Sequence, residues 1–424
     1  MQKVIFHIDV NSAFLSWTAA YRVRVLGEAL DLREIPSAVA GEKANRHGII
    51  LAKSLPAKKF GVKTGEPIFQ AQKKCPELVL VPPDYALYVQ ASRHLIALLK
   101  NFAPVVEQYS IDEAWADMTG TEGLYGSPVA AAELLRQKIY DELGFTVNIG
   151  VSSNKLLAKM AGDFEKPNKV HTLFPWEMEK KLWPLPVREL FMLGPATERK
   201  LHLMGIHTIG ELAKTDVELL RRRFGKAGVS LWNSANGRYQ DNLRAEAEPN
   251  KGFGNSTTLP SDVTDAAQAY RVLLSLCETV GMRMRQDKKA TRCLSVSLRS
   301  REFQTFSHQK TLPTATDSTE ELFRTACQTF DEAWDGVTPL RQLGVQASRL
   351  EERGQRQYSL FDIADAVDYE KKAKLDDLID DLREKHGEGI IRRARFVGTE
   401  TVLAGGLSKE RRTGVTKPLT EEEP

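Results

Sequence analysis

The segment Ser110-Ile111-Asp112-Glu113-Ala114 places two carboxylates side by side between two apolar runs. Each run alternates in the manner of a strand, which predicts a hairpin with the acids at its turn. Adjacent buried carboxylates repel each other and are poorly solvated, and a bound divalent cation relieves that cost most simply. Mg²⁺ prefers hard oxygen ligands and usually needs only one or two protein carboxylates beside phosphate and water. A further acid nearby would complete a two-metal site for phosphoryl transfer.

Asp9 is the acid that best completes this set. Residues 4–10 predict a buried strand, so Asp9 lies near the carboxyl end of that strand, a common position for site residues in α/β sheets. A helix is expected from about Ser12, a good N-cap residue. Taken alone, an Asp at such a position is more often a cap or loop residue. Together with Asp112 and Glu113 it predicts a metal site.

Length, charge and cysteine content limit the classes of protein to which this sequence can belong. The chain has 424 residues, which is too long for one ordinary core and predicts several domains. Its net charge of +3 requires any nucleic-acid-binding surface to be local. The four cysteines are scattered without a CxxC pair, which argues against structural zinc and disulfides and fits a reducing compartment. No apolar run approaches a membrane span and the N-terminus lacks a signal-peptide layout, so we expect an intracellular protein.

The predicted elements can bring the three acids together. Amphipathic helices are expected over 84–102 and 127–143, and a strand over 146–151, in the order strand, helix, inserted unit, two hairpin strands, helix, strand. This order is a βαββαβ, ferredoxin-like arrangement, an antiparallel sheet covered by helices on one face. The inserted unit, residues 36–83, carries a cationic run of Lys53, Lys58, Lys59 and Lys63. Such a run is either a solvated face or a set of cations for a triphosphate.

The second half of the chain divides at a polar linker, residues 243–250. Before it, glycine-marked helical turns at Gly194 and at 224–228 predict helix-hairpin-helix contacts with phosphate, or plain packed helices. After it, residues 251–350 predict strand, helix, two strands, helix and strand. A local basic stripe in this part contains Arg283, Arg285, Lys288, Lys289, Arg292, Arg299 and Arg301.

Several motifs together resemble those of Y-family translesion DNA polymerases, in the bacterial DNA polymerase IV and UmuC-like branch. They are residues 7–14, 57–63, 110–114, 150–155 and 166–168, in the order that the family shows. The resemblance implies that Asp9 and Asp112 bridge two Mg²⁺ ions, that Glu113 holds the ion at the primer end, and that the main-chain carbonyl of Val10 is a further ligand.

The resemblance also implies nucleotide contacts. Phe14 matches the steric gate, whose ring leaves no room for a 2′-hydroxyl. Lys58 stands where the family commonly has Arg, and Lys166 matches a lysine that contacts the triphosphate. Leu55 stands where the family usually offers a Tyr hydroxyl, and Ala13 where many relatives have an aromatic residue. We expect these departures to alter nucleotide affinity and not to inactivate the enzyme.

The implied architecture is multi-domain α+β. It has a ferredoxin-like palm (1–11 and 80–167), small fingers (12–79), a helix-hairpin-helix thumb (168–240), a βαβ-type little finger (248–350), a clamp-binding segment (351–365), and a C-terminal helix and tail (366–424). The thumb would contact DNA through Gly194, Gly225, Lys226 and Gly228, and the little finger through the basic stripe. Such binding should weaken steeply with salt and ignore sequence.

Gln357, Leu360 and Phe361 resemble the short peptides that bind the bacterial sliding clamp, although Leu360 and Phe361 could instead dock on the chain's own core. The expected function is low-fidelity, template-directed DNA synthesis without proofreading, by a cytoplasmic bacterial monomer that uses primer–template DNA and dNTPs. The alternatives are a non-catalytic scaffold that binds clamp and DNA, and a nucleotide cyclase with the same palm. The three acids argue against the scaffold. The helix-hairpin-helix, the basic domain and the clamp-like peptide argue against the cyclase.

Overall fold

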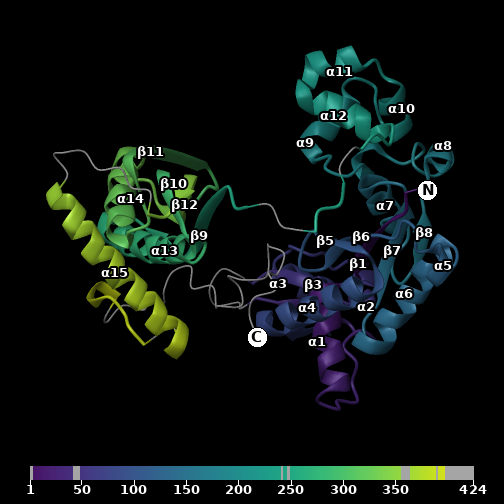
Figure 1. Ribbon diagram of the computed structural model, residues 1–424, viewed down its shortest axis with the longest axis horizontal. Coiled ribbons are helices and arrows are strands. Elements are labelled where there is room, and N and C mark those ends of the chain that lie inside the picture. Colours follow the sequence, from purple (N-terminus) through teal and green to yellow (C-terminus); the bar gives the residue numbers. More distant parts are fainter. Residues whose placement is uncertain are drawn as a thin grey trace. The chain divides into compact units, whose positions relative to one another are not determined.

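The computed structural model describes residues 3–41, 48–239, 242–245, 249–354, 363–387 and 390–396, with the side chains of 363–368 left aside. The chain divides into two compact units, with the boundary near residue 248 (Figure 1). The predicted clamp peptide, which contains Gln357, Leu360 and Phe361, lies outside the described residues. None of the helices in the described part of the chain is long and apolar enough to cross a membrane.

The palm of the first unit is a five-stranded sheet in the order β5-β6-β1-β7-β8. Its strands are β5 (Val105–Gln108), β6 (Glu113–Asp117), β1 (Ile5–Val10), β7 (Val147–Ser152) and β8 (Val170–Thr172). The central strand β1 is antiparallel to both β6 and β7, and β8 adds a strand parallel to β7. The predicted ferredoxin-like arrangement is therefore confirmed.

Helices cover both faces of this sheet. The side chains of Phe6 and Ile8 enter the main core with α4 (Tyr85–Phe102) and α6 (Pro128–Leu143). The side chain of Ile5, on the opposite face of β1, packs with Ala158 of α7 (Lys155–Gly162). The expectation of helices on one face was thus wrong, because the face of β1 that carries Ile5 and His7 is buried as well and α7 packs against it. Helix α7 lies so close that a Cβ on Gly150 would stand 1.8 Å from the Ala158 carbonyl oxygen.

The inserted unit is built on a three-stranded sheet in the order β3-β2-β4. Helix α1 (Ala13–Arg24) precedes this unit, whose elements are β2 (Ser37–Ala40), β3 (Ile50–Lys53), α2 (Leu55–Lys59), α3 (Ile68–Lys74) and β4 (Val79–Val81). Ser12 precedes α1 with φ 49° and ψ 50°, and its side chain does not cap the helix. The prediction placed the start of the helix correctly, since Ser12 is the N-cap residue of α1, but the capping hydrogen bond is absent because Ser12 is left-handed and not in the extended conformation that N-capping residues usually adopt.

The thumb is a bundle of short helices that gathers above the palm in Figure 1. The short elements that lead to it are η2 (Pro175–Glu177), α8 (Met178–Lys181) and η3 (Val187–Glu189), while the short helix α5 (Glu122–Tyr125) lies in the palm between β6 and α6. The bundle itself contains α9 (Pro195–His202), α10 (Ile209–Lys214), α11 (Val217–Phe224) and α12 (Lys226–Ala235). Leucine and isoleucine side chains of these helices form a core that also receives Leu156 and Met160 of α7. The thumb thus packs directly on the helix that covers the palm sheet.

The second unit is a four-stranded antiparallel sheet in the order β11-β10-β12-β9. Its elements are β9 (Gly252–Val263), α13 (Ala266–Gln286), β10 (Lys289–Ser300), β11 (Thr305–Thr316), α14 (Thr319–Ala333) and β12 (Leu340–Glu352). Leu294, Val296 and Leu298 of β10 share one core with side chains of both helices, so α13 and α14 cover the same face of the sheet. The predicted order of strands and helices in this domain matches the structure.

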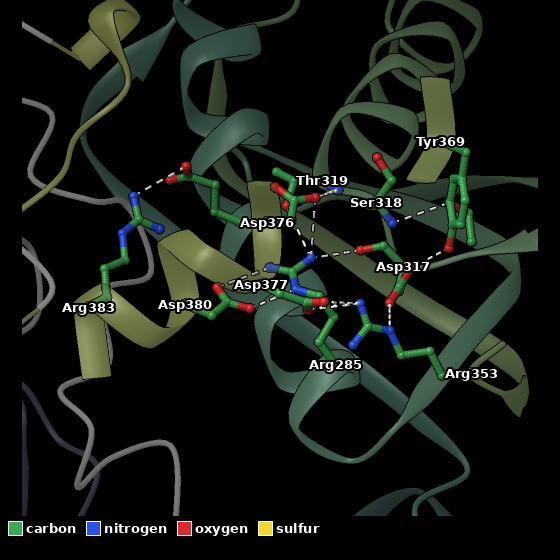
Figure 2. Close-up of polar contacts among 12 residues, drawn as sticks. Arg285, Asp317, Ser318, Thr319, Arg353, Tyr369, Asp376, Asp377, Asp380 and Arg383 are labelled. Carbon is green, nitrogen blue, oxygen red and sulfur yellow. Dashed lines mark hydrogen bonds and ion pairs between the residues drawn. The ribbon is translucent and has the colours of Figure 1, made fainter. Parts of the chain in front are cut away.

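Helix α15 (Ile363–His386) docks on this unit through ion pairs, and η4 (Ala394–Phe396) follows it. Figure 2 shows Arg285 of α13 between Asp376 and Asp380 of α15, at 3.6 and 2.6 Å. Arg353, just after β12, pairs with Asp317 at 2.6 Å and with Asp377 at 2.8 Å. Removing one partner from such a buried network leaves an uncompensated charge. Helix α15 is therefore held chiefly by its acidic side, while Leu375 and Leu378 stay exposed.

Candidate active site and nucleic-acid contacts

The backbone of the palm brings the three predicted carboxylates to one edge of the sheet. Asp9 and Glu113 are direct partners in the register of β1 and β6. Just beyond this pair, the Val10 N–H donates to the Asp112 carbonyl oxygen at 3.1 Å. The turn that precedes β6 is thereby fixed against the end of β1. Residues that lie about a hundred positions apart in the sequence thus meet at one point.

Each carboxylate has its own partner in this structure. Asp9 forms an ion pair with Lys166, which also contacts Asp163 at 2.8 Å. Asp112 Oδ1 accepts a hydrogen bond of 2.7 Å from the Ser110 hydroxyl. Glu113 Oε1 lies 2.6 Å from the Lys159 ammonium. No cluster of three or more His, Cys, Asp or Glu side chains arranged to hold a metal is found among the described residues. These contacts engage Asp9 Oδ2, Asp112 Oδ1 and Glu113 Oε1, so each acid has a second carboxylate oxygen that could bind a shared ion.

The electrostatics of Asp9 fit a divalent cation. The residue is 8% exposed, and burial raises its pKa from 3.8 to about 6, although Lys166 lowers it and the neighbouring Glu113 and Asp112 add to the rise. The charge of Asp9 is therefore not adequately compensated by the protein. A hard cation would supply the missing positive charge, and carboxylate oxygens are the ligands that such a cation prefers.

A cavity of about 370 Å³ opens beside these acids. It is lined by Asp9, Val10, Asn11, Ser12, Ala13, Phe14, Leu51, Ala52, Lys53, Ser54, Leu55, Lys58, Thr64, Asp112, Lys166 and Pro167. The structure thus brings together the predicted metal and nucleotide residues around one cavity, apart from Glu113, which does not line it but is the register partner of Asp9. Lys53 and Thr64 were not predicted as site residues, and their side chains are hydrogen-bonded at 3.1 Å. The only sequence signal for Lys53 was its place in the cationic run.

The ring of Phe14 is held by other aromatic side chains. It stacks on Tyr88 with a centroid distance of 4.4 Å and an interplanar angle of 6°. The edge of Tyr85 meets it at 6.0 Å. Tyr88 is itself buried, and its hydroxyl lies 3.1 Å from the Thr18 hydroxyl. The ring on the cavity wall is therefore backed by a packed cluster that limits its movement.

The predicted thumb contacts fall into two groups. Gly194 is the N-cap of α9, and a Cβ there would meet nothing within 4 Å, so its backbone is open to approach. Lys226 is exposed. Gly228 is buried instead. The backbone of α11 lies so close that a Cβ on Gly228 would stand 2.3 Å from the Leu220 carbonyl oxygen. The Gly228 N–H already donates to the Gly225 carbonyl. The prediction that Gly228 contacts DNA was wrong, since this glycine serves the close packing of α11 and α12.

The basic stripe is not one continuous surface. Arg285 is only 7% exposed and lies in the ion-pair network with α15 (Figure 2), so the prediction that it contacts DNA was wrong. Lys289 pairs with Glu352 of β12. Arg292, Arg301 and Arg283 have local partners as well, in Glu351, Asp262 and the Gly254 carbonyl. Lys288 is exposed at the turn before β10, with φ 53°. None of these pairings was visible in the spacing of the residues.

Arg299 lies on the face of the β11-β10-β12-β9 sheet that α13 and α14 do not cover. Along β10 the residues that alternate with the buried Leu294, Val296 and Leu298 lie on the face away from the helices. With their neighbours on the other strands they form a face of polar side chains: Ser256, Thr258, Ser295, Ser297, Arg299, Ser307, Gln309, Gln342 and Gln346. Hydroxyl and amide groups of this kind contact phosphate and sugar without reading bases.

A ferredoxin-like palm with acids at its edge, a lysine-lined cavity beside them, a helical thumb and a separate sheet-and-helix domain define a nucleotidyl-transferring polymerase architecture. A family model described as the impB/mucB/samB family matches residues 8–163, and one described as its C-terminal domain matches residues 250–360. The chain belongs to this family, in the branch of the bacterial Y-family DNA polymerases IV, as the sequence motifs predicted.

Individual relatives agree with this placement. The DNA polymerase IV of Clostridium acetobutylicum is 44% identical over 401 residues, which cover 94% of this chain and 100% of the relative. That of Alkaliphilus oremlandii is 36% identical over 404 residues, with 94% and 100% covered. A solved Y-family DNA polymerase chimera has the same fold, with a TM-score of 0.70 at 23% identity, and the match covers 82% of this chain and 100% of that one.

Proposed function

We infer that this chain is a DNA-directed DNA polymerase that acts in translesion synthesis and depends on a divalent metal. The observation that carries this conclusion is the edge of the palm, where Asp9, Asp112 and Glu113 meet beside a cavity that Lys53 and Lys58 line. Membership of the polymerase family supports it, since the relatives named above are DNA polymerases IV. The substrates are primer–template DNA and dNTPs. The scaffold and cyclase alternatives gain no support from these relatives.

The residues of the cavity have distinct tasks in this proposal. Asp9, Asp112, Glu113 and the Val10 carbonyl would hold two Mg²⁺ ions, which would lower the pKa of the primer 3′-hydroxyl and stabilise the charge of the transition state. The ammonium groups of Lys53, Lys58 and Lys166 bind the triphosphate and stabilise the leaving pyrophosphate. Lys cannot form the bidentate contact of Arg, so Lys58 contributes charge more than geometry.

DNA binding is assigned to two surfaces. The thumb offers the backbone at Gly194 and Gly225 and the side chain of Lys226, which suit phosphate contacts. The polar face of the β11-β10-β12-β9 sheet, with Arg299 on it, suits the backbone of a duplex. Neither surface reads bases, so the enzyme accepts any template sequence. It works as a monomer without proofreading, in the bacterial cytoplasm where its DNA substrate lies.

Primer extension on a duplex with a 5′ overhang tests this function. We expect the purified chain to add the dNTP that the template specifies when Mg²⁺ is present, and to add none in EDTA. Affinity for the same DNA should fall by about two orders of magnitude or more between 50 and 200 mM salt, since several phosphates are neutralised. DNA binding without extension at any Mg²⁺ concentration would contradict the polymerase assignment and favour the scaffold.

A sliding clamp is the proposed partner of the segment that contains Gln357, Leu360 and Phe361, which lies outside the described residues. The support is the peptide sequence and its place directly after β12. Deletion of residues 357–361 is expected to abolish stimulation by the clamp and to leave synthesis without the clamp unchanged. The measurement is product length with and without added clamp. Equal stimulation of the deletion variant would show that the clamp binds elsewhere.

A further inference from the structure

Helix α7 carries two buried lysines that the proposed function leaves without a task. All of its residues are buried, and Lys155 and Lys159, one turn apart, are 3% and 7% exposed. The Lys155 ammonium lies 2.9 Å from both oxygens of Glu107. The Lys159 ammonium lies 2.6 Å from Glu113 Oε1. A buried ammonium is costly unless it is paired, so both lysines are committed to these acids.

The two lysines differ in what their partners do. Glu107 lies in β5, and its Oε2 also accepts a hydrogen bond of 2.8 Å from the Arg244 N–H. Glu113 is the first residue of β6 and the register partner of Asp9. Lys155 therefore links α7 to β5 of the sheet through Glu107, which is not one of the proposed metal ligands. Lys159 contacts a carboxylate that belongs to the proposed metal site.

Aromatic rings fix the ammonium of Lys159. It lies 5.8 Å from the centroid of Tyr109 and 5.2 Å from that of Phe191. Tyr109 precedes the acidic turn, whereas Phe191 lies in the loop between η3 and α9 that leads into the thumb. The Phe191 N–H contacts Met160 Sδ at 3.4 Å, which ties that loop to α7. Two ring faces and one carboxylate thus hold the charge of Lys159, and one of the rings belongs to the thumb.

We propose that Lys159 is a positioning residue that holds Glu113 in place for the metal at the primer end and lowers the affinity of the site for that metal. The ammonium fixes Glu113 Oε1 against free rotation of the side chain. The same positive charge repels a divalent ion that approaches this carboxylate. Because Phe191 of the thumb loop contacts Lys159, a shift of that loop would also shift Lys159 and, through it, the side chain of Glu113. The inference rests on the proposed role of Glu113 as a metal ligand.

Titration of the full chain with Mn²⁺, followed by electron paramagnetic resonance without DNA, tests this role. We expect Lys159→Met to bind Mn²⁺ about tenfold more tightly, because a unit charge has been removed a few ångströms from the site. Lys159→Arg keeps the charge and should restore the affinity of the wild type. Lys155→Met is the matched control: it removes an equally buried, equally paired lysine, and its Mn²⁺ affinity should stay within about twofold of the wild type.

A second pair of variants separates positioning from mere structure. In the Glu113→Gln background the change Lys159→Met should raise Mn²⁺ affinity by clearly less than it does in the wild type, since the part of the effect that passes through that carboxylate is lost and only the direct repulsion of the ion remains. Lys159→Gln retains a hydrogen-bond donor without charge and replaces Lys159→Met if that variant does not fold. Unchanged Mn²⁺ affinity in the neutral variants, or an equal rise in Lys155→Met, would overturn the proposal. Primer extension by the wild type, run in parallel, reports on the proposed function separately.

Discussion

Asp9→Asn is expected to abolish primer extension and, at the same time, to raise the melting temperature of the metal-free protein at pH 8. Extension should fall by at least about a thousandfold, because the variant loses one of the carboxylates proposed to hold the metal that would activate the primer. Stability should rise because the pKa of the buried Asp9 is about 6 against an ordinary 3.8. At about 1.4 kcal/mol for each pKa unit, its ionisation costs the fold about 1–3 kcal/mol.

The difference in stability between Asp9→Asn and the wild type depends on pH. A carboxyl whose pKa is raised by folding binds its proton more tightly in the folded state, so the wild type loses stability as pH rises from about 4 to 6. Melting curves in EDTA should therefore show a gap of a few degrees between Asp9→Asn and the wild type above pH 7, closing below about pH 4. Asp163→Asn, which removes the other carboxylate partner of Lys166, is the control and should show no such gap. A lower melting temperature for Asp9→Asn at pH 8 would contradict the account.

Phe14→Ala is expected to raise the use of ribonucleotides relative to deoxyribonucleotides by about a hundredfold or more. The ring lines the cavity proposed to bind the nucleotide and is stacked on Tyr88, so it cannot move aside for a 2′-hydroxyl. An alanine removes the obstacle and leaves the metal ligands intact. The measurement is the ratio of kcat/KM for an rNTP to that for the matching dNTP.

Tyr21→Ala is the matched control for the steric gate. Tyr21 is an aromatic residue of the same helix α1, it is 39% exposed, and it does not line the cavity. Its replacement should leave the discrimination ratio unchanged. An unchanged ratio in Phe14→Ala would place the sugar of the nucleotide away from this ring, while a loss of both activities would show that the ring is needed for the fold of α1.

The sequence determined the features that depend on neighbouring residues. A largely apolar run marked β1, and alternation of apolar side chains marked the strands beside the acidic turn, so Asp9, Asp112 and Glu113 were placed near strand ends by local pattern alone. The order of elements was enough for the palm topology, since short connections leave few ways to pair the strands. The elements of the second unit followed from the same kind of signal.

Only the tertiary structure shows which of the charged residues and glycines can contact a ligand and which are buried or paired within the protein. Arg285 stood in a basic stripe, yet its partner Asp380 lies 95 residues further on and buries it. Gly228 stood in a plausible phosphate-binding turn, yet the carbonyl of Leu220 occupies the space beside it. Lys159 stood in an apolar helix, and its pairing with Glu113 appears only when α7 packs on the sheet. A local pattern fixes where a side chain points along its own element, whereas its electrostatic partner comes from distant segments that only the folded chain brings near.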